Sequence, residues 1–307
     1  MSENYDVIII GAGPAGLTAA LYTTRAGLNT LIIEKEMFGG ALMNRDLIDN
    51  YPGHPEILGP DLASQMLEQA TSYGAEMQMG IVEQIIVKDN QKIVKTDQDE
   101  YVGNAIIIAG GTHAKKLGIP GEEEFAGKGV IHCATCDGPL YREQVVAVVG
   151  GSNDAIYEAL SLVKYTSKVL VIHRGDNLRA EKVLRERAFG EPKIEFIWDT
   201  TVTAVLGEST VSGIQLNNIK TGETSTLNVD GVCMAVGNTP NTDILAGIVK
   251  LGSEGAIPVN VSMETEVPGI LAAGNIREDS PMRVASAIGD GATAAMAAER
   301  YINTTLR

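Results

Sequence analysis

The sequence predicts an α/β protein of two domains, each built on a parallel sheet, with the second domain inserted into the first. Three observations lead to this prediction. A strand, a glycine-rich turn and a helix open the chain. The same pattern returns 139 residues later, with Gly150 in the place of Gly11, and an apolar strand and an Ala-rich helix close the chain. A length of 307 residues is also typical of two domains.

The opening pattern carries the first candidate site. Residues 5–10 form a short apolar strand, and residues 11–16 (Gly11, Ala12, Gly13, Pro14, Ala15 and Gly16) fit the motif G-x-G-x-x-G. Residues 17–25 have helix-forming composition, and Gly27 marks the end of that helix. Residues 30–33 form the next strand, which ends at Glu34.

The three glycines of this motif have separate physical roles. Gly11 permits the tight turn, Gly13 lets the backbone approach a pyrophosphate, and Gly16 lets the helix pack on the strand. The pyrophosphate is expected at the helix N-terminus, where free N–H groups and the helix dipole favour negative charge. Glu34 lies 18 residues after Gly16, where a carboxylate can accept hydrogen bonds from a ribose 2′-OH. The pattern predicts a Rossmann-like dinucleotide-binding domain, and a βα turn without a ligand is the alternative.

The second copy of the pattern ends on basic rather than acidic residues. Residues 144–149 form its strand, residues 150–155 its turn, residues 156–163 its helix and residues 168–172 its next strand. His173 takes the place of Glu34 in this alignment, and Arg174 follows it. This difference separates recognition of a free ribose 2′-OH from recognition of a 2′-phosphate. Two such folds predict two redox carriers, or one carrier and a vestigial site.

The remaining expected strands and the closing helix indicate where the two domains begin and end. Residues 101–109, 232–236 and 269–273 are expected strands, and residues 289–302 are expected to form the closing helix. The chain crosses to the second domain near Pro120-Gly121 and returns at residues 240–244. We therefore expect a discontinuous first domain, residues 1–116 and 245–307, and an inserted second domain, residues 117–244.

Charge and composition exclude several classes of function. The chain has 24 basic and 39 acidic residues, a net charge of −15, which argues against nucleic acid or an anionic membrane as a partner. Residues 7–24 carry no charge, but Glu3 and Asp6 precede them and glycines interrupt them, so a signal sequence or membrane span is not expected. A cytoplasmic location is expected. The four histidines and three cysteines lack the spacing of a zinc site, so no metal is expected.

A C-x-x-C motif is the chemically reactive part of the second domain. Cys133 and Cys136 flank two residues, and Asp137 follows them directly. In a cytosolic protein with two nucleotide folds this spacing favours a redox dithiol over half of a zinc site or two incidental thiols. Asp137 lies where it can pass a proton when a thiolate attacks or leaves. Cys233 lies in an apolar run and is expected to be a core residue.

At these residues the chain resembles the low-molecular-weight, bacterial-type thioredoxin reductases, over nearly its whole length. CATCDG at residues 133–138, placed just before a second nucleotide turn, is the most specific match. The other matching motifs are GAGPAG with Glu34, MFGG (37–40), DNYPG (49–53), IPGE (119–122), VVGG (148–151), the Arg174 and Arg179 region, and GNTPNT (237–242).

The resemblance implies a homodimeric enzyme that passes electrons from NADPH through FAD and the dithiol to thioredoxin. FAD would contact Gly11, Gly13, Pro14, Ala15, Gly16, Glu34, Gly40, Asn50, Asn275, Arg283 and Val284. NADPH would contact Gly151, Ser152, Asn153, Asp154, His173, Arg174 and Arg179. The family pattern also implies that Cys136 faces the flavin, that Cys133 attacks the partner's disulfide, and that Asp137 acts as acid and base. It further implies a rotation of the smaller domain about hinges near residues 115–120 and 240–245.

The sequence departs from the family pattern at both nucleotide sites. Ser152 stands where Gly is usual in the second turn, and Gly175 stands where the basic motif usually has a second Arg. One lost charged contact to a 2′-phosphate costs about 1.5–3 kcal/mol, roughly ten- to a hundredfold in affinity. On the flavin side, Ala41, Asn275 and Val284 stand where Gln, Asp and Gln are usual.

These departures leave two alternatives beside the NADPH-dependent reductase. In the first, reduced ferredoxin or another flavin supplies the electrons for the same disulfide chemistry. In the second, the protein is a flavin-dependent dithiol oxidase that passes electrons to oxygen, or a redox-regulated binding protein. The CATCDG motif argues against this second alternative.

Overall fold

The computed structural model describes residues 3–88 and 91–305 of the chain and divides it into two compact units. Unit 1 comprises Met1–His113 and Thr239–Arg307, and unit 2 comprises Ala114–Asn238. The chain passes between the units through two short strands, β9 (Thr112–Ala114) and β18 (Asn238–Pro240), which pair with each other. None of the helices in the described part of the chain is both long and apolar enough to span a membrane.

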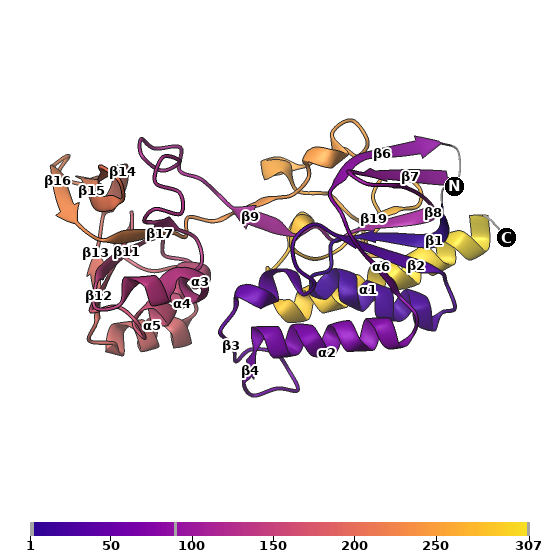
Figure 1. The fold of residues 1–307 in the computed structure, drawn as a ribbon, viewed down its shortest axis with the longest axis horizontal. Coiled ribbons are helices and arrows are strands. Elements are labelled where there is room, and N and C mark those ends of the chain that lie inside the picture. Colours follow the sequence, from indigo (N-terminus) through magenta and orange to yellow (C-terminus); the bar gives the residue numbers. More distant parts are fainter. Residues whose placement is uncertain (1–2, 89–90, 306–307) are drawn as a thin grey trace. The chain divides into compact units, whose positions relative to one another are not determined.

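Unit 1 is built on a sheet with the strand order β5-β2-β1-β8-β7-β6, with β19 also pairing with β8 (Figure 1). Strands β1, β2, β5, β8 and β19 are parallel, whereas β6 and β7 form an antiparallel extension. The strands of this unit are β1 (Glu3–Ile10), β2 (Thr30–Glu34), β3 (Leu47–Ile48), β4 (Ile57–Leu58), β5 (Glu76–Met79), β6 (Val82–Lys88), β7 (Gln91–Thr96), β8 (Glu100–Ile108) and β19 (Ile270–Ala272). Its α-helices are α1 (Pro14–Arg25), α2 (Gly59–Ser72) and α6 (Val284–Thr305).

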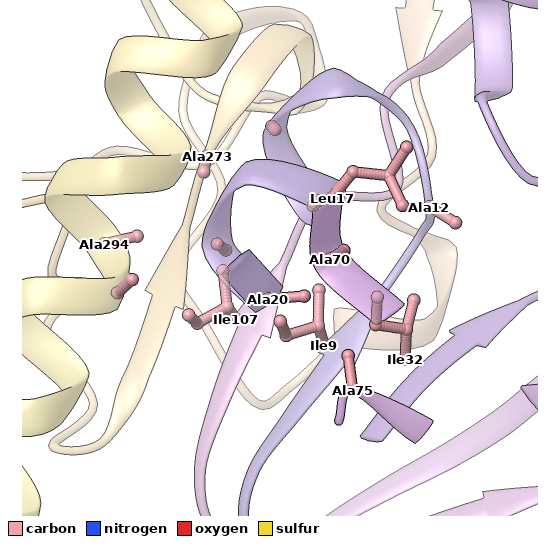
Figure 2. Close-up of a cluster of buried hydrophobic side chains, with 14 of the residues drawn as sticks. Ile9, Ala12, Leu17, Ala20, Ile32, Ala70, Ala75, Ile107, Ala273 and Ala294 are labelled. Atoms are coloured by element: carbon pink, nitrogen blue, oxygen red, sulfur yellow. The ribbon is translucent and has the colours of Figure 1, made fainter. Parts of the chain in front are cut away.

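The central strands of unit 1 are apolar on both faces because both faces are covered. Side chains alternate along β1, so that Ile9 packs under α1, α2 and α6 while Ile8 and Ile10 pack on the opposite side. Figure 2 shows the first of these clusters, in which Ile9, Ile32 and Ile107 meet alanines of the helices. The small alanine side chains let α1 and α6 approach the sheet and each other closely.

Unit 2 has three layers. Its parallel sheet has the order β10-β17-β11-β12-β13, with helices on one face and an antiparallel sheet β14-β15-β16 on the other (Figure 1). The strands are β10 (Val130–Ile131), β11 (Val145–Val149), β12 (Lys168–Ile172), β13 (Ile194–Ile197), β14 (Thr200–Gly207), β15 (Val211–Asn218), β16 (Thr224–Asn228) and β17 (Gly231–Met234). The helices are α3 (Ala134–Asp137), α4 (Asn153–Leu162) and α5 (Lys182–Gly190). The two parallel sheets confirm the expected α/β class with Rossmann-like units.

The internal repeat of the sequence is also present in the residue pairing of the strands. Strand β1 pairs with β2 so that Val7 lies opposite Thr30, and β11 pairs with β12 so that Val146 lies opposite Val169. The hydrogen bond from Gly11 N to Ile33 O (2.8 Å) returns as Gly150 N to Ile172 O (3.0 Å). In each comparison the residue numbers of the two units differ by 139, the offset that aligns Gly11 with Gly150. The two glycine turns therefore leave equivalent ends of equivalent strands.

The closing helix begins earlier than expected. We predicted it from residue 289, whereas α6 starts at Val284 and runs to Thr305. Gly289 and Gly291 lie inside the helix and do not mark its start. A Cβ on Gly291 would lie 2.2 Å from Ala15 O, so this glycine permits the close packing of α6 on α1.

Candidate functional site

The N-terminus of α1 in unit 1 has no side-chain cap. Its N-cap residue, Gly13, offers no side chain to cap the free backbone N–H groups, Pro14 follows it, and no acidic residue lies in the first turn. The surrounding glycines are required by packing, since a Cβ on Gly11 would lie 2.4 Å from Ala109 O and one on Gly16 would lie 1.9 Å from Gly11 O. The turn thus presents uncapped donors and the positive end of the helix dipole, which suits a pyrophosphate.

Glu34 lies at the end of β2, beside this turn. Its Oε2 accepts a hydrogen bond of 2.7 Å from Ala12 N, and its Oε1 accepts hydrogen bonds of 2.9 Å from Lys35 N and Glu36 N. A pocket of about 250 Å³ adjoins the carboxylate. Its lining includes Gly11, Glu34, Gly80, Val82, Asn241 and Asp243. A buried, oriented carboxylate beside a pocket and a phosphate-type turn fits the ribose and base of a dinucleotide.

Two further glycines bring other predicted residues to the α1 N-terminus. A Cβ on Gly40 would lie 2.9 Å from Gly13 Cα, and one on Gly274 would lie 2.9 Å from the Cβ of Ala15. Three segments therefore converge on one helix end: the glycine turn, the start of the 3₁₀ helix Gly40–Asn44, and the 3₁₀ turn Gly274–Ile276. Figure 2 shows Ala12 and Leu17 of this region together with Ala273, the residue that precedes the second turn.

The other predicted flavin residues lie on the Gly274–Ile276 turn, at the start of α6 and between β3 and β4. Asn275 Oδ1 accepts a hydrogen bond of 3.5 Å from Ser280, and Asn50 is exposed on the segment between β3 and β4. Among the described residues, neither asparagine hydrogen-bonds to the glycine turn. Arg283 donates to Met282 O at 3.0 Å, and Val284 is the first residue of α6.

A buried ion pair that the sequence did not indicate holds the Gly274–Ile276 turn. Asp290 on α6 accepts hydrogen bonds from Gly274 N (3.2 Å), Arg277 Nε (2.7 Å) and Arg277 Nη2 (3.1 Å). Arg277 also donates to Glu278 O at 2.9 Å. The two residues of the pair lie on different elements, so no local sequence motif indicates it. It ties the turn to the same helix that packs on α1.

The turn of unit 2 is less open than its counterpart in unit 1. Ser152 is the N-cap of α4, and its hydroxyl accepts a hydrogen bond of 3.5 Å from Ala155 N. Asp154 adds a carboxylate to the first turn and accepts a hydrogen bond from Asn238. Asn153 exchanges hydrogen bonds with Glu181, at 3.0 and 2.7 Å. The α4 N-terminus therefore has part of its donors and dipole already satisfied by its own side chains.

His173 lies against Gly151 in the position where Glu34 meets Ala12. A Cβ on Gly151 would lie 2.4 Å from His173 Nδ1, so glycine is required there. Burial lowers the pKa of His173, and the nearby charges of Arg179 and Arg174 lower it further. The two arginines are exposed, and Arg179 N donates to Gly151 O at 2.9 Å. Neutral imidazole and two cations thus border the second turn, a suitable arrangement for an anionic group on a ribose.

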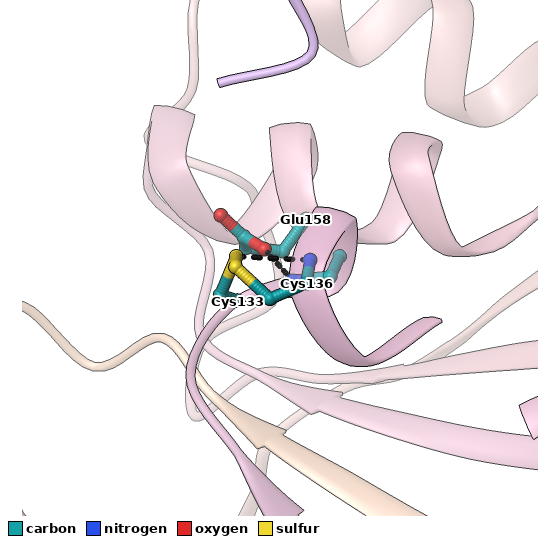
Figure 3. Close-up of a disulfide and its surroundings, with 4 residues drawn as sticks. Cys133, Cys136 and Glu158 are labelled. Carbon is teal, nitrogen blue, oxygen red and sulfur yellow. Dashed lines mark hydrogen bonds between the residues drawn. A yellow bond between two sulfur atoms is a disulfide. The ribbon is translucent and has the colours of Figure 1, made fainter. Parts of the chain in front are cut away.

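The dithiol lies at the start of α3 in unit 2. Cys133 and Cys136 form a disulfide (Figure 3), and Cys133, the N-cap of α3, accepts a hydrogen bond of 3.1 Å through its Sγ from Cys136 N. Cys136 is exposed and Cys133 is half-buried. Partial burial raises the pKa of the Asp137 carboxyl, and the nearby His132 opposes that rise. A carboxyl that keeps its proton to higher pH than usual suits a proton donor to a leaving thiolate.

Cys233 is a core residue, as expected. It lies on β17 with no exposed surface, and burial raises the pKa of its thiol well above the usual value. The charges of Glu158 and Asp137 add to that rise. Its thiol is therefore inert beside the reactive pair. In the described part of the chain no cluster of three or more His, Cys, Asp or Glu side chains could hold a metal ion.

Comparison with known proteins places the chain among flavin-type disulfide reductases. Residues 5–291 match the family model of the pyridine nucleotide-disulphide oxidoreductases. The chain is 44% identical to the thioredoxin reductase of Bacillus subtilis over 305 residues, covering 98% of this chain and 96% of that protein. It is also 44% identical to the thioredoxin reductase of Treponema pallidum, covering 99% of each. The crystal structure of Lactococcus lactis thioredoxin reductase superposes with a TM-score of 0.96 at 39% identity, over 97% of this chain and 99% of that one.

Proposed function

Because the chain belongs to the pyridine nucleotide-disulphide oxidoreductase family, and within it to the low-molecular-weight bacterial-type thioredoxin reductases, we propose that it is an FAD-dependent thioredoxin-disulfide reductase that uses NADPH. One observation carries the proposal: the Cys133–Cys136 disulfide lies in a unit that also holds a dinucleotide-type turn with basic residues. A redox-active pair beside a nucleotide fold is the arrangement that a disulfide reductase needs.

FAD would bind to unit 1. Its pyrophosphate would lie at the uncapped N-terminus of α1, its adenosine ribose at Glu34, and its base in the adjoining pocket. When bound, FAD supplies two-electron exchange between the nucleotide donor and the disulfide. NADPH would bind to unit 2 at residues 151–154, with His173, Arg174 and Arg179 around its 2′-phosphate.

The dithiol reaction follows from the chain's own groups. In the reduced enzyme, the Cys133 thiolate attacks one sulfur of the thioredoxin disulfide, which gives a mixed disulfide and releases one thioredoxin thiolate. Asp137 donates a proton to that thiolate. The Cys136 thiol then gives its proton to the Asp137 carboxylate and attacks Cys133 Sγ, which restores the Cys133–Cys136 disulfide. The second thioredoxin sulfur leaves as a thiolate and takes that proton from Asp137. Two electrons and two protons pass to thioredoxin in each cycle. The separate roles of Cys133 and Cys136 rest on the family resemblance.

A second electron donor is proposed beside NADPH, because unit 2 has features that weaken a nucleotide site. Ser152 caps α4, Asp154 places a carboxylate in its first turn, and Gly175 leaves the basic loop with one cation fewer. In this variant of the proposal, reduced ferredoxin supplies the electrons and the dithiol chemistry is unchanged. The proposal includes in both cases a homodimer, which the resemblance implies, and a cytoplasmic location.

The disulfide chemistry is tested without any nucleotide donor. The FAD-loaded protein is reduced with dithionite under anaerobic conditions, excess reductant is removed, and oxidised thioredoxin is added. The proposal predicts about four new thioredoxin thiols per fully reduced active site, two from the dithiol and two from the reduced flavin, which are detected by alkylation and mass measurement. Cys133→Ser and Cys136→Ser should both abolish turnover, and Cys233→Ser should not. Failure of the wild type to form thioredoxin thiols would refute the proposed function.

A further inference from the structure

One carboxylate beside the dithiol is not explained by the proposed reaction. Glu158 lies on α4, and its Oε2 accepts a hydrogen bond of 2.6 Å from Ala134 N, the backbone donor that directly follows Cys133. Figure 3 shows the Glu158 carboxylate next to the disulfide, at the first turn of α3. The contact spans 24 residues of sequence and joins two separate helices.

We propose that Glu158 is a positioning residue that fixes the first turn of α3 and, through its negative charge, disfavours ionisation of the Cys133 thiol. It thereby keeps the pair strongly reducing. The inference deepens the proposed function and rests on it, because it concerns the same redox pair.

The hydrogen bonds of the turn support the positioning role. A helix start has free N–H groups that can stabilise a thiolate. Here Cys136 N donates to Cys133 Sγ at 3.1 Å, while Ala134 N donates to Glu158. The carboxylate thus holds the first backbone N–H of the turn, and the N–H of Cys136 is the one that bonds the sulfur. Because Glu158 is held on the longer helix α4, its bond also fixes the backbone beside Cys133.

The charges around the pair support the electrostatic role. The titratable groups near this turn include His132, Asp137, Tyr141 and Cys233. Glu158 and Asp137 both contribute to the raised pKa of Cys233, and Asp137 contributes to the raised pKa of Tyr141, although burial is the larger cause in each case. His132 is the cation-forming group that opposes them, and it is exposed. The Glu158 carboxylate, held on the backbone of the residue after Cys133, adds negative charge beside that sulfur and raises the cost of ionising its thiol.

The consequence for a reductase follows from thiol chemistry. Reduction of the disulfide adds two electrons and two protons, and a stabilised thiolate would favour the reduced form and make the pair a better oxidant. Glu158 acts in the opposite direction. The pair then releases its electrons more readily to a substrate disulfide, which is the direction that the proposed function requires.

Glu158→Gln separates charge from geometry, because glutamine keeps a carbonyl oxygen that can accept from Ala134 N. The FAD-loaded enzyme is reduced with excess dithiothreitol, desalted, and alkylated with iodoacetamide from pH 5 to 10. Cys233 is buried and does not compete. We expect the midpoint of the reactive thiol to fall by on the order of one pH unit in the glutamine variant. At a pH above both alkylation midpoints, we also expect the disulfide of that variant to be reduced at about tenfold lower ratios of reduced to oxidised glutathione.

Glu195→Gln is the matched control. Glu195 is an exposed carboxylate on β13, at the opposite edge of the sheet from β10, and it pairs with Lys168 at 2.7 Å. Unchanged alkylation and redox midpoints in Glu158→Gln, equal to those of this control, would overturn the inference. A shift in Glu158→Ala without one in Glu158→Gln would also overturn it, because only the anchoring bond would then matter. Neither measurement needs NADPH or thioredoxin, so failure of the proposed function would be seen separately.

Discussion

The buried pair of Asp290 and Arg277 gives the most quantitative prediction for unit 1. Asp290 accepts three hydrogen bonds, one from Gly274 and two from Arg277, and the side chains of the pair are only 9% and 15% exposed. Asp290→Ala leaves the guanidinium without its carboxylate and the turn without its anchor. Removal of one partner of a buried pair costs about 3–5 kcal/mol, and the residual exposure places this pair near 3 kcal/mol.

The expected loss of stability is measurable by heat. For a domain of about 150–250 residues, 1 kcal/mol corresponds to about 2–4 °C, so Asp290→Ala should lower the Tm by about 6–12 °C. Because Gly274 contacts the α1 N-terminus, we also expect FAD affinity to fall at least tenfold, as measured by flavin fluorescence. Thermal unfolding is followed by circular dichroism, with Glu68→Gln on α2 as an exposed-carboxylate control.

A double substitution tests whether the unpaired guanidinium causes the loss of stability. Asp290→Ala with Arg277→Met removes the unpaired charge, so the double variant should be more stable than Asp290→Ala alone. A Tm for Asp290→Ala within 2 °C of the wild type, with unchanged FAD affinity, would refute the argument that this pair holds the turn.

Three further predictions concern unit 2. Gly175→Arg should lower the KM for NADPH about tenfold relative to Gly175→Ala, because it restores a charged contact to the 2′-phosphate; equal KM values in steady-state assays would contradict this. Leu140→Asp should raise the KM for thioredoxin, since this apolar side chain is 76% exposed just beyond the dithiol, and should leave the reduction of a small aromatic disulfide unchanged. Burial raises the pKa of Asp137, so its proton is present at low pH and is lost as pH rises through that raised pKa. The rate of thioredoxin reduction should therefore decline on the alkaline side, and Asp137→Asn should be slow at every pH and lack that decline.

Much of the parallel core could be predicted from the sequence, because apolar runs that end in glycine mark buried strands. Residues 5–10, 30–33 and 168–172 became β1, β2 and β12, and Gly27 follows the C-cap of α1 with a φ of +76°. The shared register of β1–β2 and β11–β12 explains why one offset aligns both turns. Local pattern was sufficient here because burial on both faces requires continuous apolar sequence.

The antiparallel strands β6 and β16 have no comparable apolar run that ends in glycine. Strand β16 is Thr224–Asn228, mostly polar and exposed, and β6 has only two buried residues, Val82 and Ile85. Such strands are specified by their pairing partners and not by their own composition. They were therefore absent from the prediction.

The functional residues could be predicted only where they belong to a local sequence motif. The glycine turns, Glu34 and Cys133–Cys136 are each local patterns. Glu158 and Asp290 act on backbone groups of residues 134 and 274, which lie on other elements. These contacts depend on how helices dock against turns, and no spacing within one segment encodes them.

The most direct test of the proposed enzyme is an anaerobic titration of the FAD-loaded protein with NADPH, followed by the flavin absorbance. We expect rapid bleaching that saturates at low NADPH concentration and recovers when oxidised thioredoxin is added. Absence of bleaching with NADPH, in a protein whose flavin is still reduced by dithionite and reoxidised by thioredoxin, would contradict NADPH as the donor.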